Sequence, residues 1–256
     1  MSMRWHAVVL AGSRPGGDPF ALSMGANLKA LIPVNGVPMV RHPVEALLNC
    51  DAIATVTVLA QEAERIAATL PEDKRLQVRT SAGTIAETLL SLCDDPETVW
   101  PLLVTTADHA LLTPEMVRDV CWKSTRSDVG IGVVSKRRLL GRFPDTKRTW
   151  IPFKGGSFTG ANLFVLRSDK VRTVIEVWRS VEQDRKKVGK LLWSLGPSLF
   201  FQAALRRLTI EELLHKISVR LGVSIRAVRL SDPLAAIDVD KPSDHQQVEA
   251  ILAGRQ

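Results

Sequence analysis

The stretch Ala7-Val8-Val9-Leu10-Ala11-Gly12-Ser13-Arg14 runs from an apolar strand into a turn of small residues, and Lys29 follows in a second apolar segment, residues 27–34. Gly12 lets the backbone approach a ligand without a Cβ in the way. Arg14 and Lys29 can neutralise a polyphosphate, the first as a two-pronged donor and the second as a point charge. The pattern indicates a phosphate-binding turn. The alternative is an ordinary turn with two solvated cations, because glycine-rich turns after a first strand are common.

Segments of strand length alternate with segments of helical periodicity along the chain. The expected strands cover residues 7–10, 55–60, 76–80, 102–105, 129–134, 161–166 and 225–230. The expected helices cover residues 38–49, 62–70, 84–92 and 114–123, the last opened by Thr113 as N-cap and Pro114 in the first turn. This alternation predicts an α/β fold with a mostly parallel sheet, helices on both faces, and ligands at the carboxyl ends of the strands.

Length and composition favour one folded domain. The chain has 256 residues, of which 45% are hydrophobic, enough to bury a full core. It contains no apolar run long enough for a membrane span and no signal-peptide pattern at its start, so we expect a cytoplasmic protein. The 3 cysteines lie far apart, without the spacing of a zinc site or a disulfide framework.

Charge is divided unequally between the two halves. Residues 1–135 carry 11 Lys+Arg against 15 Asp+Glu, whereas residues 136–256 carry 23 against 12. Such asymmetry predicts that the second half meets an anion, whether a phosphorylated substrate, a nucleic acid or a membrane surface. The alternative is a solvated basic surface.

Asp108 follows an apolar strand that ends in Thr105-Thr106-Ala107. A carboxylate just past a buried strand is well placed to hold Mg²⁺, which prefers oxygen ligands and usually takes one or two carboxylates besides substrate phosphates. The alternative is an aspartate that caps the following turn. His109 has no second histidine at metal-ligand spacing and is interpreted as a packing or loop residue.

Asp238 and Asp240 alternate along the extended segment 236–240, just before a helix that is expected to start near Pro242 or Ser243. Alternate residues of an extended chain share a face, so the two carboxylates can form a second half of the metal site. The alternative is that Asp240 or Ser243 only caps the helix, with Gln246 completing a capping box from Ser243.

Taken together, the Leu-Ala-Gly turn, the lysine in Lys-Ala-Leu-Ile-Pro-Val, Asp108 and the Asp-Val-Asp-Lys-Pro-Ser-Asp segment at 238–244 resemble the nucleotidyltransferases that include molybdenum cofactor guanylyltransferase. The resemblance covers nearly the whole chain in the same order. It implies a Rossmann-like three-layer α/β/α fold of the GT-A type. It also implies transfer of an NMP group from an NTP to a phosphorylated acceptor, with release of pyrophosphate.

The resemblance also implies roles for individual residues. Lys29, Arg14 and Asp108 are the candidate catalytic residues, and Asp108, Asp240 and Asp238 are the candidate Mg²⁺ ligands. Segment 80–88 is similar to the loop and helix start that meet the base and ribose, where Thr84 can also cap the helix; a plain strand-to-helix loop is the alternative. The nucleotide-binding candidates are Leu10, Ala11, Gly12, Ser13, Ala82, Gly83 and Thr84.

This chain departs from the family pattern at the phosphate turn. Members often have Arg-Met-Gly shortly before the lysine, whereas Ser23 stands here where arginine is expected. Residues 15–22 look like an insertion, and Arg14 can supply the missing cation from its other side.

In the implied reaction an acceptor phosphate oxygen attacks the α-phosphorus of the NTP in line. The protein then mainly positions the groups and neutralises charge, with Mg²⁺ as its metal, and no general base is needed because a phosphate monoester is already anionic. Acceptor contacts are expected from the cation-rich residues 136–162, with Thr159, Gly160 and Asn162 as binding candidates. A solvated hairpin is the alternative for that region. The acceptor can be a sugar phosphate, an alcohol phosphate or a cofactor phosphate.

Residues 168–222 exceed what the minimal fold needs and combine basic with apolar helical sequence, broken at Gly196-Pro197. The segment is interpreted as an insertion or lid within one domain spanning residues 1–256. A dimer surface, an interfacial membrane helix and ordinary helix packing stay open as alternatives. Thr209 and Glu212 predict a capping box at the start of a further helix.

Two other functions compete with this interpretation. A nucleic-acid-binding protein would explain the basic second half, but the chain shows no helix-turn-helix, zinc-finger or RRM signature and has no tyrosine, so no nucleic acid partner is expected. A glycosyltransferase of related fold would use a nucleotide sugar, for which the lysine of a triphosphate-binding turn is unnecessary. The sequence leaves open which of GTP, CTP or UTP is used, which acceptor is used, and the oligomeric state.

Overall fold

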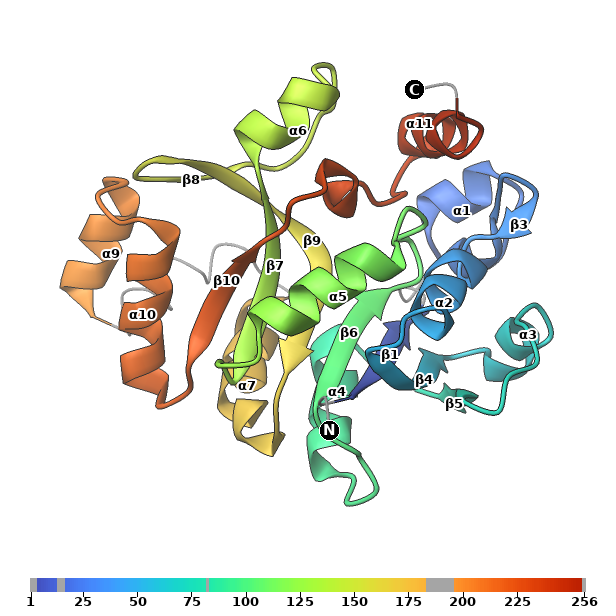
Figure 1. Ribbon diagram of the computed structural model, residues 1–256, viewed down its shortest axis with the longest axis horizontal. Coiled ribbons are helices and arrows are strands. Elements are labelled where there is room, and N and C mark those ends of the chain that lie inside the picture. Colours follow the sequence, from blue (N-terminus) through green and yellow to red (C-terminus); the bar gives the residue numbers. More distant parts are fainter. Residues whose placement is uncertain (1–3, 13–16, 82, 183–195, 255–256) are drawn as a thin grey trace.

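One sheet of eight strands forms the centre of the computed structural model, which describes residues 4–12, 17–81, 83–182 and 196–254 (Figure 1). Across the sheet the order is β5-β4-β1-β6-β9-β7-β10, with β8 paired to β9. The strands are β1 (Trp5–Leu10), β4 (Ile53–Ala60), β5 (Leu76–Thr80), β6 (Leu102–Thr106), β7 (Val129–Ser135), β8 (Ile151–Phe153), β9 (Gly156–Leu166) and β10 (Ile225–Arg229).

The sheet is mostly parallel, as the sequence predicts. The pairs β1–β4, β4–β5, β1–β6 and β7–β10 are parallel. Strand β9 runs antiparallel to its neighbours β6, β7 and β8. All seven predicted strands are present, whereas β8, only three residues long, was not predicted.

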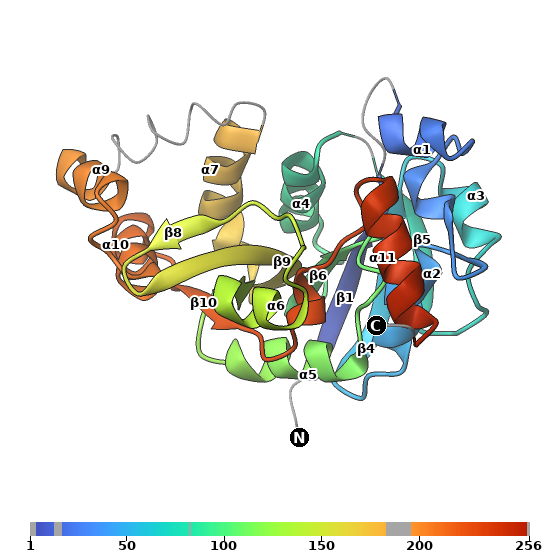
Figure 2. The ribbon, with the colours of Figure 1, turned by 90° about the horizontal axis from the view of Figure 1, so that it is seen from above.

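Helices cover both faces of this sheet, which confirms the three-layer arrangement. Figure 2 shows α4 and α7 on one face and α2 and α5 on the other. The helices are α1 (Pro19–Ser23), α2 (Arg41–Leu48), α3 (Ala63–Ala67), α4 (Ile85–Asp94), α5 (Pro114–Lys123), α6 (Lys136–Arg142), α7 (Arg172–Glu182), α9 (Pro197–Ala204), α10 (Ile210–Leu221) and α11 (Pro242–Leu252).

The sequence of strand β1 is almost continuously apolar because both faces of the strand are buried. Its side chains alternate between two buried clusters, because successive residues of a strand point to opposite faces. Val8 packs in the cluster that contains Leu89 of α4. Val9 packs in the cluster that contains Leu47 of α2 and Val117 of α5. Burial on both faces holds β1 at the middle of the sheet.

The strand order also reverses beside β1. From β1 the chain adds β4 and β5 on one side, and then β6 on the other side of β1. In open α/β sheets ligands bind where the order reverses in this way. The loops after β1 and β6, which carry Gly12 and Asp108, both begin at that point.

Local capping signals mark the starts of several helices. Thr113 caps α5 with Pro114 in the first turn, Thr84 caps α4, and a capping box at Thr209 opens α10, as predicted. The Thr84 cap also forms a capping box with Glu87. Helix α3 occupies only part of the predicted range 62–70.

One predicted helix start and one predicted helix cap were wrong, whereas the start of α11 at Pro242 confirms the prediction. The helix expected from Pro38 begins at Arg41, because Asn35 and Gly36, both with positive φ, form a tight turn that pairs Pro33 with Pro38. The capping box expected at Ser243 is not formed. Helix α11 already begins at Pro242, so Ser243 lies inside its first turn.

The region 168–222 is described as α7, α9 and α10, and its basic centre at residues 183–195 lies outside the described residues. Ile210 of α10 packs against Val133, Phe158 and Ala227 of the sheet, so α10 covers the β10 end. Whether this region serves as a lid, a dimer surface or a membrane-facing element stays a prediction. None of the described helices has the length and apolar character required to cross a bilayer.

His109 is buried directly behind the loop after β6, with 1% of its surface exposed. Its Nδ1 lies 3.3 Å from the Thr105 hydroxyl, and its Nε2 has no hydrogen-bond partner in the part of the chain that the structure describes. Burial lowers the pKa of His109 to about 4, although the nearby Asp108 charge opposes that shift. The imidazole is therefore a neutral packing group at pH 7, which agrees with its interpretation from sequence.

We expect His109 to make the protein less stable in acid. Between about pH 6.5 and pH 4 the unfolded chain protonates His109 whereas the folded chain does not, so stability falls as pH falls, by roughly 2 kcal/mol at pH 4.5. His109→Leu should lose that part of the pH dependence in urea unfolding between pH 7.5 and 4.5. His215→Leu, on the exposed part of α10, is the control and should follow the wild type. Equal slopes for His109→Leu and the wild type would contradict the expectation.

Candidate active site

Backbone hydrogen bonds tie the segment after β1 to its two neighbours at the carboxyl edge. The Ala107 amide, after β6, donates to the Leu10 carbonyl over 3.0 Å, and the Ala11 amide donates to the Leu59 carbonyl of β4 over 2.9 Å. These bonds continue the sheet beyond the strand ends and bring the turn that begins at Ala11 beside the loop of Asp108. The first two sequence signals thus belong to one place.

Gly12 lies exposed in this turn, and its role differs in detail from the one expected. Its backbone lies outside the positive-φ region. A Cβ added at Gly12 would lie 3.1 Å from the side-chain nitrogen of Gln61, the first residue after β4. The small residue therefore allows close approach to Gln61 and leaves the turn open to solvent. Gln61 was not singled out from the sequence.

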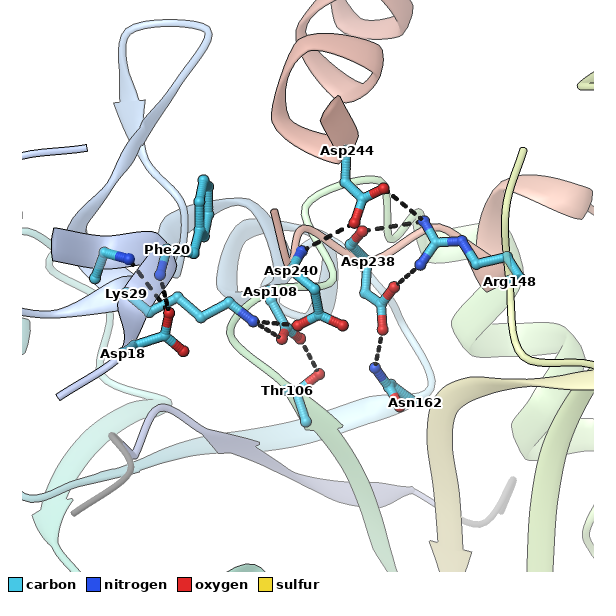
Figure 3. Close-up of polar contacts among 11 residues, drawn as sticks. Asp18, Phe20, Lys29, Thr106, Asp108, Arg148, Asn162, Asp238, Asp240 and Asp244 are labelled. Atoms are coloured by element: carbon cyan, nitrogen blue, oxygen red, sulfur yellow. Dashed lines mark hydrogen bonds and ion pairs between the residues drawn. The ribbon is translucent and has the colours of Figure 1, made fainter. Parts of the chain in front are cut away.

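Asp108 is held by a hydroxyl on one oxygen and a cation on the other (Figure 3). The Thr106 hydroxyl, at the end of β6, donates to Oδ1 over 2.5 Å. Lys29 Nζ donates to Oδ2 over 2.6 Å. The side chain is 17% exposed, so it lies partly buried at the carboxyl edge of the sheet. Thr106 fixes the carboxylate and leaves its second oxygen to the cation.

Lys29 lies between two carboxylates. It stands in a short 3₁₀ turn, Lys29–Leu31, and its Nζ donates to Asp108 Oδ2 over 2.6 Å and to Asp240 Oδ1 over 2.5 Å. Burial by itself would lower the pKa of Lys29, but the charges of Asp108 and Asp240 outweigh it and raise that pKa. The lysine is therefore a permanent cation that joins the start of the chain to its end.

The segment that carries Asp240 is docked beside Asp108 through its backbone. The Val239 amide donates to the Asp108 carbonyl over 3.1 Å, and the Asp240 amide donates to the Asp244 carboxylate of α11 over 3.3 Å. The Asp240 side chain is 57% exposed, the most open of the site carboxylates. Its carboxylate is therefore open to solvent while it contacts Lys29.

Asp238, grouped with Asp240 from the sequence, has different partners. Its Oδ1 accepts a hydrogen bond from Arg148, and its Oδ2 accepts one from Asn162 Nδ2 over 2.9 Å. Burial, together with the neighbouring charges of Asp240 and Asp108, raises the pKa of Asp238, although Arg148 opposes the shift. Both oxygens of Asp238 are thus engaged by the protein, whereas Asp108 and Asp240 share one cation.

Arg148 is buried at the centre of this second group, with 10% of its side chain exposed. Besides the Asp238 carboxylate it contacts the Asp238 carbonyl at 3.1 Å and the Asp244 carboxylate at 3.9 Å (Figure 3). The sequence placed Arg148 among cations available to an acceptor. In the structure its guanidinium instead ties the segment before β8 to the loop before α11. A single sequence could not show that pairing, because the partners are 90 residues apart.

The remaining acceptor-side candidates lie on β9. Thr159 is buried and paired with Val134, and Gly160 is exposed with open space around its Cα. Asn162 has a φ of 46° where the register between β7 and β9 shifts. Such a bulge redirects a side chain, which explains how Asn162 reaches Asp238. Strand β9 therefore links the candidate acceptor loop to the carboxylate cluster.

The nucleotide-side loop is partly described. Gly83 has a φ of 98°, a backbone conformation that favours glycine, and a Cβ there would also displace Glu87 Oε2, which would lie 2.4 Å away. Thr84 forms the capping box of α4 with Glu87. Ser13, Arg14 and Ala82 lie outside the described residues.

The described residues hold no group of three or more His, Cys, Asp or Glu side chains arranged for a metal ion. They do bring the oxygens of Asp108 and Asp240 to within 2.6 Å of one cationic nitrogen. That arrangement suits a cation that takes its other ligands from a substrate, as Mg²⁺ does with phosphates.

Comparisons with known proteins agree with this geometry. Residues 7–217 match the family described as the MobA-like NTP transferase domain. A solved structure of a hypothetical transferase from Thermus thermophilus is 30% identical with a TM-score of 0.76, over 95% of this chain and 100% of that chain. No curated protein matches the sequence.

Two more distant structures share the fold. CMP:2-keto-3-deoxy-manno-octonic acid synthetase complexed with CTP is 15% identical with a TM-score of 0.61, over 99% of this chain and 100% of that chain. The 4-diphosphocytidyl-2C-methyl-D-erythritol synthase from Anaerococcus prevotii is 10% identical with a TM-score of 0.59, over 98% and 96%.

We expect Arg148 to be important for stability. Arg148→Met leaves the partly buried Asp238 without its cation and the buried Asp244 with only Lys241 at 3.9 Å among the described cations, and it should cost about 3 kcal/mol, as the loss of one member of a buried ion pair does. Arg148→Lys should recover part of that loss. Arg118→Met, which removes an exposed arginine paired with Asp51 and Glu115, is the matched control and should cost under about 1 kcal/mol. Chemical denaturation measures all three, and equal losses for Arg148→Met and Arg118→Met would refute the assignment.

Proposed function

The chain belongs to the MobA-like NTP transferase family and is a nucleotidyltransferase, and we propose that it transfers an NMP group from an NTP to a phosphorylated small-molecule acceptor, releasing pyrophosphate. The observation that carries this proposal is the meeting of Lys29, Asp108 and Asp240 at the carboxyl edge of β1 and β6. An ammonium and two carboxylates at a sheet crevice can together hold a polyphosphate and its counter-ion.

Asp108 and Asp240 are the residues that would hold Mg²⁺. Their oxygens already converge on one positive charge, the Lys29 ammonium, so the donor set fits a hard cation. Mg²⁺, when bound, would neutralise phosphate charge and favour departure of pyrophosphate. Asp238 is proposed to contribute indirectly, since Arg148 and Asn162 occupy its two oxygens.

The nucleotide is proposed to bind along the carboxyl edge between the turn at 10–13 and the loop at 82–84. The backbone at Gly12 would face the phosphates, with Lys29 and Arg14 as their cations, and Gly83 and Thr84 would border the base and ribose. The positive φ of Gly83 supports this role, because it brings backbone rather than a side chain to the loop surface.

The acceptor is proposed to approach from β9, across the cluster from the nucleotide. Gly160 leaves open space there, and Asn162 lies at the carboxylate cluster. An anionic phosphate oxygen of the acceptor would attack the α-phosphorus directly, so orientation and charge neutralisation supply the rate enhancement. This chemistry requires no histidine base, and the buried, neutral His109 is consistent with that.

Removal of either carboxylate should abolish transfer. Asp108→Ala and Asp240→Ala are each expected to lower NTP-dependent pyrophosphate release by at least about 100-fold. Both should also lose the thermal stabilisation that Mg²⁺ with NTP gives the wild type. Asp51→Ala removes an exposed carboxylate outside the site and should behave as wild type. If both site variants keep stabilisation and activity, the proposed metal site is wrong.

The acceptor class can be tested with each NTP against sugar 1-phosphates, alcohol phosphates and molybdopterin. Pyrophosphate release should require the acceptor phosphate, because the unphosphorylated compound lacks the attacking oxygen. Gly160→Val should raise the acceptor KM by roughly tenfold, because the added side chain fills space proposed for the acceptor. It should leave stabilisation by NTP unchanged, because no protein atom lies within 4 Å of a Cβ at this position and the fold can accept the side chain. Gly141→Ala, at an equally open position on α6, is the control. An unchanged acceptor KM in Gly160→Val would place the acceptor elsewhere.

A further inference from the structure

Lys29 occupies the position between Asp108 and Asp240 that the proposed metal would need. Its Nζ is 2.6 Å from one carboxylate and 2.5 Å from the other, and its side chain is 17% exposed. Two of the three N–H donors of the ammonium are used on these oxygens, and a metal ion held between the same two oxygens would require the ammonium to move away from them. Lys29 therefore has two alternative sets of partners.

The carboxylates need a cation at all times. Asp108, Asp240 and Asp238 are close enough for the charges of the first two to act on the third. Arg148 compensates Asp238, which leaves Lys29 to compensate the other pair. Like charges at this separation are unfavourable, more so in a partly buried site. In the free chain, Lys29 meets this need.

A metal ion arriving alone would gain little here. It would find two carboxylates, because no larger group of metal-binding side chains gathers in the described part of the chain. It would also displace the Lys29 ammonium into a mostly buried position, where no other acid pairs with it among the described residues. An unpaired buried charge is costly, and Mg²⁺ gives up its water reluctantly.

A nucleotide triphosphate would remove both obstacles to metal binding, the shortage of metal ligands and the lack of a partner for the displaced Lys29 ammonium. Its phosphate oxygens can accept the Lys29 ammonium as the lysine leaves the carboxylates. The same phosphates supply the ligands that a metal lacks between Asp108 and Asp240. Metal entry and lysine departure then become favourable only when the triphosphate is present.

We infer that Lys29 is a placeholder cation, which holds the two carboxylates together in the free enzyme and excludes divalent metal until a nucleotide triphosphate draws it away. This inference rests on the proposed function, because it takes Asp108 and Asp240 as the metal ligands. It assigns Lys29 a second role, in determining when the metal binds.

The test is Mn²⁺ binding in the absence of nucleotide. Binding is measured from the decrease in the EPR signal of free Mn²⁺ and from the shift in the melting temperature of the protein. Lys29→Gln, which removes the charge but keeps a donor, should bind Mn²⁺ at least about tenfold more tightly than the wild type. Without metal it should melt below the wild type, and Mn²⁺ should raise its melting temperature. Lys29→Arg should exclude Mn²⁺ as the wild type does.

Lys241→Gln is the matched control. Lys241 is half exposed and follows Asp240 directly, but among the described residues its one ion-pair contact is with Asp244 at 3.9 Å. Lys241→Gln removes one positive charge near the site, as Lys29→Gln does, but it should leave the affinity for Mn²⁺ unchanged. If Lys241→Gln tightens Mn²⁺ binding as much as Lys29→Gln, general electrostatics explains the effect and the placeholder role is refuted.

The failures of the two proposals are distinguishable. If wild type and Lys29→Gln bind Mn²⁺ alone equally well and both lose it with Asp108→Ala, the metal site stands and the placeholder role fails. If Lys29→Gln binds no Mn²⁺ and Asp108→Ala leaves the response to Mg²⁺ with NTP unchanged, the metal site fails as well. If Lys29→Gln does not fold, Lys29→Met is refolded with and without Mn²⁺ in the buffer. A yield of folded protein that does not depend on Mn²⁺ overturns the inference.

Discussion

The site depends on the compensation of three neighbouring carboxylates by two cations. Asp108, Asp238 and Asp240 lie in one partly buried cluster, where uncompensated negative charge would be costly. Lys29 joins Asp108 to Asp240, and Arg148 joins Asp238 to the Asp244 end of α11. Because Lys29, Asp108, Arg148 and the segment 238–240 come from distant parts of the chain, their pairing also holds these parts together at the carboxyl edge of the sheet. The contacts that balance the charge of the site are therefore also the contacts that hold these segments together.

The sheet makes that pairing possible. The reversal of strand order beside β1 places the loops after β1 and β6 together, and the Ala107–Leu10 hydrogen bond fixes their spacing. The Val239–Asp108 bond then adds the loop before α11 at the same edge. Strand β9, antiparallel beside β6, delivers Asn162 from the other direction through its bulge. A nucleotide on one side and an acceptor on the other would meet at the cluster.

Much of the fold and part of the site could be predicted because their signals are local. The apolar runs of β1 and β6 indicated buried central strands, and the Thr84, Thr113 and Thr209 caps marked helix starts correctly. Asp108 stood out because it follows a buried strand directly. The antiparallel direction of β9 and the pairing of Arg148 were not predictable in this way, because both depend on contacts between distant segments. The Ser243 capping box failed because α11 begins one residue before it.

The sequence alone determined the α/β layering and the positions of Gly12, Lys29, Asp108 and the aspartate pair at the ends of elements, since periodicity and end signals act over a few residues. Only the tertiary structure decided which aspartate faces which cation. Asp238 and Asp240 are two residues apart and chemically identical, yet one is bound by Arg148 and Asn162 and the other shares Lys29 with Asp108. That division follows from which charged groups the folded chain brings within hydrogen-bonding distance, a property that no local pattern contains.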